Sequence, residues 1–293
     1  MYSKTTPDKL VTMKYNIANI GTKEWLDFKR DISFGLYYAL KRLNKNIEMS
    51  INGFDKGALN IIIGADFLVG QNIIQKIVKE NIDYAIYETE NFSGASINNR
   101  HNFDIYEYVD LIRSAKFVIT PYITNVWQYH KYASEVDVRY AKWGYYDELI
   151  NVNIKREKKY YLYDAIFYGL LKGDRAETVR KITVKYGDRF KIIDRNDPFT
   201  FKEYYFQNTK CGLNLNYGSD AEFTNPFRIY EMLANDIPVI SDNQKDDDGY
   251  TELCIKGSSD EVVEMIAKCL PTTGGKNEAL RDIRLDVNLR KIL

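Results

Sequence analysis

Arg228 and Glu231 stand three residues apart in a segment of helical pattern, and together they could bind two parts of one ligand. Side chains at positions i and i+3 of a helix project from roughly the same face. An arginine guanidinium binds phosphate oxygens in a bidentate geometry, and a carboxylate accepts hydrogen bonds from hydroxyl groups such as those of ribose. The same two residues could instead form an ion pair on a solvated helix, which is the commoner arrangement.

The residues before this pair predict an anion site at the start of a helix. Asn225 and Pro226 precede a predicted helix over residues 227–234, and a polar loop connects them to a predicted strand over residues 211–215. Proline suits the first helical position, where no backbone N–H is needed. The unpaired N–H groups of such a helix, at the carboxyl edge of a parallel sheet, attract anions. We therefore predict that Asn225 and the helix start bind a pyrophosphate.

A glycine followed by basic residues lies where a predicted strand over residues 165–168 leads into a predicted helix over residues 175–186. Gly169 lets the backbone approach a ligand closely, and Lys172 and Arg175 can neutralise a diphosphate. The alternative is an ordinary glycine turn with solvated charges.

The segment NPFRIYEMLANDIPVISD, residues 225–242, resembles the donor-binding segment of GT-B glycosyltransferases of group 1, the glycogen-synthase-like group. In those enzymes the helix carries an arginine or lysine and a glutamate before a small-residue turn and a Pro-Val-Ile strand. The resemblance implies that Arg228 and Glu231 bind a nucleotide-sugar donor and that Arg228 takes part in catalysis. Many related members pair an earlier acidic residue with the glutamate, and Glu222, the nearest here, lies one residue further away.

The same resemblance extends to the glycine turn. Similar families place phosphate-binding basic residues in the first turn of their C-terminal domain, which implies that Gly169, Lys172 and Arg175 contact the donor diphosphate. Asp194 follows a predicted strand over residues 190–193, at a position where related enzymes contact the base through backbone groups.

The N-terminal half offers candidates for the acceptor side and for a catalytic base. Gly21 and Thr22 occupy the first βα turn, which faces the cleft in this architecture. Glu90 follows a predicted strand over residues 84–87, so its carboxylate could point into the cleft as a base, although exposed loop carboxylates are the usual case. His101 is a further candidate, although a single histidine is more often structural or simply exposed.

Short apolar runs alternate with segments of helical period along the chain, which predicts βα units and largely parallel sheets. The predicted strands are 15–20, 59–63, 84–87, 117–120, 138–142, 165–168, 190–193, 211–215, 238–240 and 253–255. A charged stretch, residues 151–159, indicates a linker. We predict an α/β fold with two Rossmann-like βαβ domains facing a central cleft, residues 1–153 and 154–270. Residues 271–293 could form a helix that returns to the first domain.

Composition and missing motifs narrow the classes of function. Lys plus Arg and Asp plus Glu both number 41, so no global electrostatic field favours nucleic acid or anionic membrane. Two histidines and three cysteines without a CxxC pair argue against a zinc centre built by the protein. Signal-peptide and membrane-spanning patterns are missing, so we expect a cytoplasmic protein. Motifs of P-loop ATPases, dinucleotide-dependent dehydrogenases, serine hydrolases and zinc proteases are missing too.

These features predict transfer of a hexosyl or pentosyl group from a nucleotide diphosphate sugar, with UDP expected, to an acceptor hydroxyl, without a metal or cofactor. The acceptor stays open among a glycan, a small molecule, a protein and a modified DNA base. Two other interpretations remain: a nucleotide-sugar 2-epimerase, and a nucleotide-sugar-binding protein without catalytic activity.

Overall fold

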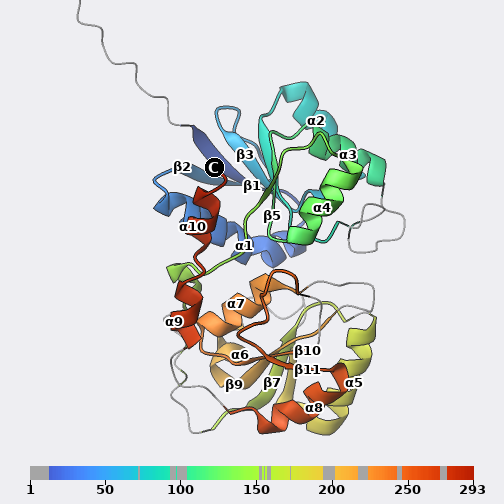
Figure 1. Cartoon of the computed structure of the whole chain (residues 1–293), viewed down its shortest axis with the longest axis vertical. Coiled ribbons are helices and arrows are strands. Elements are labelled where there is room, and N and C mark those ends of the chain that lie inside the picture. The colour runs from blue at the N-terminus through green and yellow to red at the C-terminus, as the bar shows by residue number, and fades with distance from the viewer. Residues whose placement is uncertain are drawn as a thin grey trace, which may run out of the picture.

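Each half of the chain folds around its own β-sheet, and the two sheets lie one above the other along the long axis of the molecule (Figure 1). This computed structural model describes residues 13–71, 73–92, 97, 104–151, 154, 156, 160–171, 173–193, 202–216, 224–242, 246–270 and 276–293. In these residues the strand order is β2-β1-β3-β4-β5-β6 in the first sheet and β11-β10-β9-β7-β8 in the second, with parallel pairing throughout. The predicted α/β fold with two Rossmann-like domains is confirmed.

The central strands of the first sheet are buried on both faces because they are nearly continuous apolar runs. Ile17 and Ile61 point to one face and share a core with Leu36 of α1, whereas Ile62 and Ile86 point to the other face, beneath α2, α3 and α4. The elements are β1 (Lys14–Asn19), α1 (Lys23–Arg42), β2 (Asn46–Ile51), β3 (Leu59–Ile63), η1 (Ala65–Leu68), α2 (Ile73–Glu80), β4 (Tyr84–Tyr87), α3 (Ile105–Arg113), β5 (Val118–Thr120), α4 (Ile123–Tyr132), β6 (Val138–Tyr140) and η2 (Asp147–Leu149).

The edge strand β2 is missing from the sequence-based prediction. It pairs with β1 along its whole length, but its residues are intermediate or exposed rather than buried. Glu48 and Ser50 alternate with Ile47, Met49 and Ile51, which is the period-two pattern of a strand with one polar face. The strand has only six residues and closely follows the long helical pattern of α1, so the prediction overlooks its alternation.

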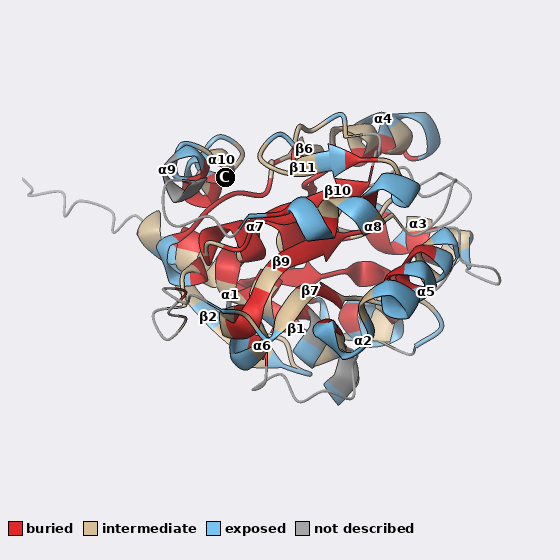
Figure 2. Cartoon of the chain, turned by 90° about the horizontal axis from the view of Figure 1, so that it is seen from below, coloured by how far each residue is buried: buried red, intermediate tan, exposed pale blue. Residues whose placement is uncertain are grey.

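The second sheet carries helices on both faces, and the outward surfaces of α5 and α8 are exposed (Figure 2). Its elements are β7 (Tyr163–Tyr168), α5 (Asp174–Tyr186), η3 (Gly187–Arg189), β8 (Phe190–Ile193), α6 (Lys202–Asn208), β9 (Thr209–Asn214), α7 (Pro226–Ala234), β10 (Val239–Asp242), β11 (Ile255–Gly257) and α8 (Ser259–Lys268). Ser258 and Glu261 start α8 with a reciprocal capping box, which stabilises the helix end.

The C-terminal residues form two short helices, α9 (Lys276–Arg281) and α10 (Leu285–Arg290), and α10 packs against α1 of the first domain. Leu285 and Leu289 are fully buried in this contact. The backbone of Tyr145 exchanges hydrogen bonds with Ile283 and Leu285 at 2.7 and 3.0 Å. The chain thus crosses from the second domain back to the first.

The carboxyl ends of the two sheets face each other. Asp248 and Tyr250 follow β10 in the second domain and contact residues that follow β5 and β6 in the first. The Tyr250 hydroxyl donates to the Pro121 carbonyl at 2.6 Å and accepts from the Trp143 amide at 2.9 Å. The Asp248 carboxylate accepts from the Ile123 amide, at the start of α4, at 3.1 Å. Ligands of open α/β sheets bind at this edge.

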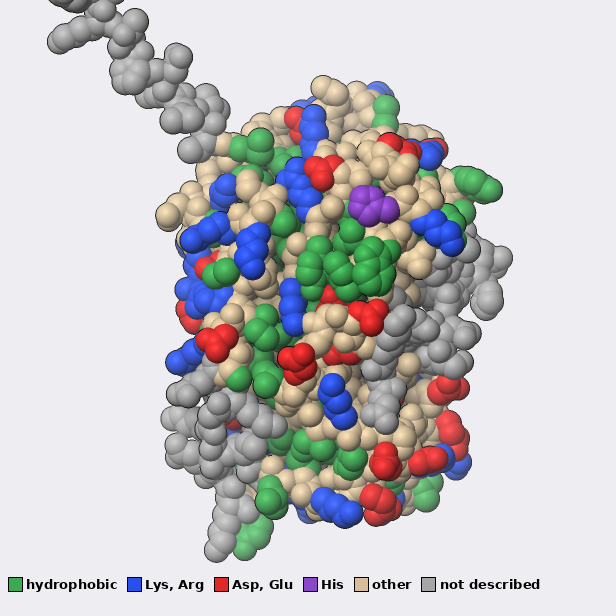
Figure 3. Space-filling model, in the orientation of Figure 1, with side chains coloured by type: hydrophobic (Ala, Val, Ile, Leu, Met, Phe, Trp, Pro, Cys, Tyr) green, Lys and Arg blue, Asp and Glu red, His purple; other side chains and the backbone are tan. Residues whose placement is uncertain are grey.

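Basic and acidic side chains are both spread over the face drawn in Figure 3, in keeping with the equal numbers of the two kinds. Among the helices in the described ranges, none combines the length and the hydropathy that a membrane span requires.

Candidate functional site

Helix α7 starts as its sequence predicts. Asn225 is the N-cap residue, in an extended conformation, and its side-chain oxygen accepts a hydrogen bond from the Arg228 amide at 3.0 Å. Pro226 is the first helical residue. This cap fixes the direction in which the first turn of α7 leaves the carboxyl edge of the sheet.

The Arg228 side chain is buried at that edge, with 5% of the residue exposed. Its Nη1 donates to the Asn214 side chain, at the end of β9, at 3.2 Å, and its guanidinium lies over the rings of Phe167 and Tyr168 at 5.1 and 5.3 Å. Its Nε is buried without a hydrogen-bond partner in the described structure. Burial lowers the pKa of Arg228, yet arginine stays protonated in proteins. A buried cation with a spare donor suits an anionic ligand.

Arg175 and Arg228 converge on Gly169. A Cβ atom at Gly169 would lie 2.6 Å from Nη2 of Arg228 and 3.5 Å from Nη1 of Arg175, and the glycine has a φ of +147°. Arg175 extends from the first turn of α5 and donates to the carbonyls of Leu215 at 3.0 Å and Leu170 at 3.0 Å. Three residues predicted from the sequence thus lie together, and the glycine leaves room for both guanidinium groups.

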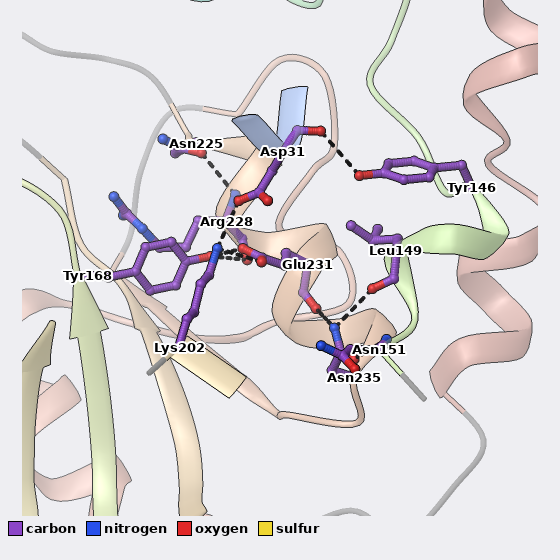
Figure 4. Close-up of polar contacts among 10 residues, drawn as sticks. All are labelled: Asp31, Tyr146, Leu149, Asn151, Tyr168, Lys202, Asn225, Arg228, Glu231 and Asn235. Atoms are coloured by element: carbon purple, nitrogen blue, oxygen red, sulfur yellow. Dashed lines mark hydrogen bonds and ion pairs between the residues drawn. The ribbon is translucent and has the colours of Figure 1, made fainter. Parts of the chain in front are cut away.

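Glu231 has a different environment from the one considered in the sequence analysis (Figure 4). Its Oε2 accepts from the Tyr168 hydroxyl at 2.8 Å, and its Oε1 lies 2.5 Å from the Lys202 ammonium. Only 14% of its side chain is exposed, so the alternative of a solvated surface pair with Arg228 is wrong. Burial and then Asp31 raise the pKa of Glu231 to about 7, against the opposing effects of Lys202 and Tyr168.

Lys202, Asp31 and Tyr168 are the members of this site that sequence reasoning missed. Lys202 and Asp31 are 171 positions apart, and their ion pair joins the two domains. No local pattern points to such a contact. Tyr168 directly precedes Gly169, so its place at the carboxyl end of a strand was the one signal available.

Gly21 and Thr22, which the sequence analysis predicts to lie on the acceptor side, form the β1–α1 turn. The Gly21 amide donates to the Asn52 side chain at 2.9 Å, and Thr22 is the exposed N-cap residue of α1. Both therefore lie at the carboxyl end of β1, the edge of the first sheet where ligands of this kind of fold bind.

Glu90 lies in the loop after β4, where the buried neighbour Glu88 organises the backbone. Glu88 accepts from the amides of Thr89 and Glu90 at 2.9 and 3.0 Å, and from the Tyr108 hydroxyl at 2.5 Å. Burial and then Asp66 raise the pKa of Glu88 to about 8, so it is protonated at neutral pH. Glu90 is half-buried at the same sheet edge.

His101, Lys172 and Asp194 lie outside the described residues, as does Glu222. Within the described residues, no group of three or more His, Cys, Asp or Glu side chains is placed to hold a metal ion.

Comparison with known proteins identifies the fold. No protein-family model and no curated protein matches the sequence. Among solved structures, Anabaena HepE in complex with UDP is 13% identical, with a TM-score of 0.50 over 95% of this chain and 98% of that one. Phage T4 β-glucosyltransferase is 11% identical, with a TM-score of 0.51 over 95% of each chain. The UDP-forming α,α-trehalose-phosphate synthase of Burkholderia vietnamiensis is 10% identical, with a TM-score of 0.54 over 96% and 95%. The chain has the GT-B fold of these structures.

Proposed function

We propose that this protein is a glycosyltransferase that moves a sugar from a nucleotide diphosphate sugar, with UDP as the nucleotide, to an acceptor hydroxyl. The observation that carries the proposal is the convergence of Arg175 and Arg228 on Gly169, with Glu231 one helical turn beyond Arg228. Two guanidinium groups match the charge of a diphosphate, and a carboxylate matches ribose hydroxyls. The fold, shared with a protein solved in complex with UDP, supports the same function.

In the proposed reaction the bond between sugar and diphosphate breaks while an acceptor oxygen attacks the sugar. Negative charge grows on the leaving diphosphate, and preorganised cations stabilise it most effectively in a buried site. Arg175 and Arg228 supply those cations, with the amino end of α7 beside them. Lys172 is a third candidate for the same charge, and Asp194 would contact the base through its backbone.

The acceptor would bind to the first domain, near Gly21 and Thr22, with Glu90 as the base that removes its proton. A general base must be ionised at the working pH and lie within hydrogen-bond reach of the hydroxyl. Glu88 is protonated at neutral pH, so it does not suit the role of the base. Its hydrogen bond from the Glu90 amide suits it to orienting the loop that carries Glu90. His101 is the second candidate for the base.

The finer assignments are part of this proposal. They are membership of the glycogen-synthase-like group, transfer of a hexosyl or pentosyl group, a cytoplasmic location, and action without a metal or cofactor. The acceptor would be a glycan, a small molecule, a protein or a modified DNA base. Phage T4 β-glucosyltransferase is a DNA-modifying enzyme, so DNA belongs in the acceptor panel.

Mass spectrometry after incubation with UDP-sugars and an acceptor panel tests the proposal. The expected result is an acceptor heavier by one sugar residue, with release of UDP, and loss of that product in Arg228→Met. Formation of an epimer from the nucleotide sugar alone would identify a 2-epimerase instead. Binding without turnover across the panel would identify a non-catalytic binding protein.

Transfer should continue in excess EDTA, because arginine side chains rather than a divalent cation carry the diphosphate charge in this proposal. Initial rates with and without the chelator measure this. Complete loss of activity on chelation, restored by Mn²⁺ or Mg²⁺, would contradict metal-independent transfer.

A further inference from the structure

Lys202 joins the donor-binding helix of the second domain to the first domain. Its ammonium lies 2.5 Å from Oε1 of Glu231 on α7 and 2.8 Å from Oδ2 of Asp31 on α1 (Figure 4). The same ammonium lies 4.8 Å from the centre of the Tyr168 ring, and 10% of the lysine side chain is exposed. One buried cation therefore serves two carboxylates from different domains.

The bonds to Glu231 do not use all of its hydrogen-bonding capacity. A carboxylate has about four lone-pair sites on its two oxygens. Lys202 approaches Oε1 and Tyr168 donates to Oε2, so each oxygen keeps one further site. Two neighbouring ribose hydroxyls could therefore bind without displacing either protein group.

The charged and titratable groups facing Glu231 come from several elements. They are Asp31 on α1, Lys202 on α6, Tyr168 on β7, Arg228 on α7 and Tyr146 beyond β6. Asp31 disfavours the ionised form of Glu231, whereas Lys202 and Tyr168 favour it. Burial lowers the pKa of Lys202, but Asp31 and Glu231 outweigh burial and raise it, so the ammonium stays charged.

We propose that Lys202 is a positioning residue for the donor, which keeps Glu231 ionised and oriented toward the ribose hydroxyls while it ties α1 to the donor-binding helix. This inference rests on the proposed function. A lysine that merely holds the domains together would affect stability. A lysine that prepares Glu231 must also change how donor affinity depends on pH.

Calorimetric titration with UDP over about pH 5.5–9 separates the two roles. In the unsubstituted protein, affinity should rise with pH as Glu231 ionises near its pKa of about 7. Lys202→Met removes a favourable charge, so the midpoint should move to higher pH. About half of Glu231 is ionised at pH 7 in the unsubstituted protein, so affinity at neutral pH should fall about fivefold for the first pH unit by which the midpoint rises and about tenfold for each further unit. Asp31→Asn removes a repulsive charge, so its midpoint should move to lower pH.

The controls keep the outcomes distinct. The phosphate of UDP also titrates, but it contributes the same pH dependence with every protein variant. Differences between the midpoints of the variants therefore report on Glu231. Lys210→Met removes a lysine that donates to the carbonyls of Ile266 and Ala267, and its midpoint should not move. Should Lys202→Met not fold, the downward movement of the midpoint in Asp31→Asn tests the same charge balance.

Coincident midpoints in Lys202→Met, Asp31→Asn and the unsubstituted protein would overturn the role of Lys202 and leave the glycosyltransferase proposal standing. Absence of UDP binding by the unsubstituted protein at every pH would instead overturn the proposed function.

Discussion

Gly169 leaves room for two arginine side chains at the proposed diphosphate site. A Cβ atom at this position would lie only 2.6 Å from Nη2 of Arg228. The φ of +147° is also rarely adopted by residues other than glycine. The missing Cβ atom therefore lets the guanidinium groups of Arg175 and Arg228 approach the same stretch of backbone. Such an arrangement fits a diphosphate, whose charge would balance both.

Replacing Gly169 with alanine should push Arg228 from its position and weaken UDP binding about tenfold or more, since charge-assisted hydrogen bonds are worth roughly 1.5–3 kcal/mol. Gly187→Ala is the matched control, because that glycine also has a positive φ, +52°, but nothing within 4 Å of its Cβ position. The control should lose about 1–3 kcal/mol of stability, because alanine rarely adopts this conformation, and should keep its UDP affinity. Calorimetric titration measures the UDP affinity of both variants, and thermal unfolding measures their stability. Equal UDP affinities of Gly169→Ala and Gly187→Ala would show that Gly169 has no part in UDP binding.

The backbone of the loop after β4 is hydrogen-bonded to one buried carboxyl group, that of Glu88. The pKa of Glu88 is raised from 4.5 to about 8, so the folded protein holds a proton that the unfolded chain releases. The folded state therefore binds more protons between these values, and stability is lost as pH rises from about 4.5 to about 8.

Glu88→Gln should abolish that loss. The amide oxygen can still accept from the backbone, and the Tyr108 hydroxyl, 2.6 Å from that of Tyr129, can reverse its direction. The melting temperature of Glu88→Gln relative to the unsubstituted protein should therefore rise between pH 5 and pH 8, as scanning calorimetry would measure. A constant difference across that range would show that Glu88 is ionised in the folded protein.

Apolar periodicity predicted the buried elements, whereas it was overlooked in one short edge strand. The buried strands β3 and β4 and the capped helix α8 follow directly from their sequences, as does the start of α7 at Asn225. The edge strand β2 was missed although Ile47, Met49 and Ile51 alternate with polar residues, because its six residues give a short signal beside the twenty-residue pattern of α1. The sequence identified Arg228 and Glu231 as two residues on one face of a helix. It could not identify Lys202 as the ion-pair partner of Glu231, because tertiary packing sets the position of this lysine.

At the scale of the whole molecule, the domains are held together at the edge where the ligand would bind. Tyr250 bonds to the first domain through both the Pro121 carbonyl and the Trp143 amide, and Lys202 bonds to Asp31 nearby. The helix α10 adds a second, apolar connection through its contact with α1. Donor binding and the relative position of the domains are therefore expected to be linked.

Tyr250→Phe should weaken this connection by leaving the buried Trp143 amide without its acceptor, at a cost of roughly 1–3 kcal/mol. The two domains should then unfold at more widely separated temperatures in scanning calorimetry. Tyr186→Phe is the control, because its hydroxyl bonds to the Val263 carbonyl within the second domain at 2.7 Å. Separation of the transitions to the same extent in both variants would argue against a specific role for Tyr250 between domains.

The central claim is that the buried Arg228 binds the diphosphate of a nucleotide sugar, and calorimetric titration with UDP tests it most directly. Arg228→Met keeps an unbranched apolar side chain at this buried position but removes the charged guanidinium that lies over Phe167. Its UDP affinity should fall about ten- to a hundredfold while its fold is retained, whereas Arg180→Met, which removes an exposed arginine paired with Glu177, should bind UDP normally. A folded Arg228→Met protein that binds UDP as tightly as the unsubstituted protein would contradict the account.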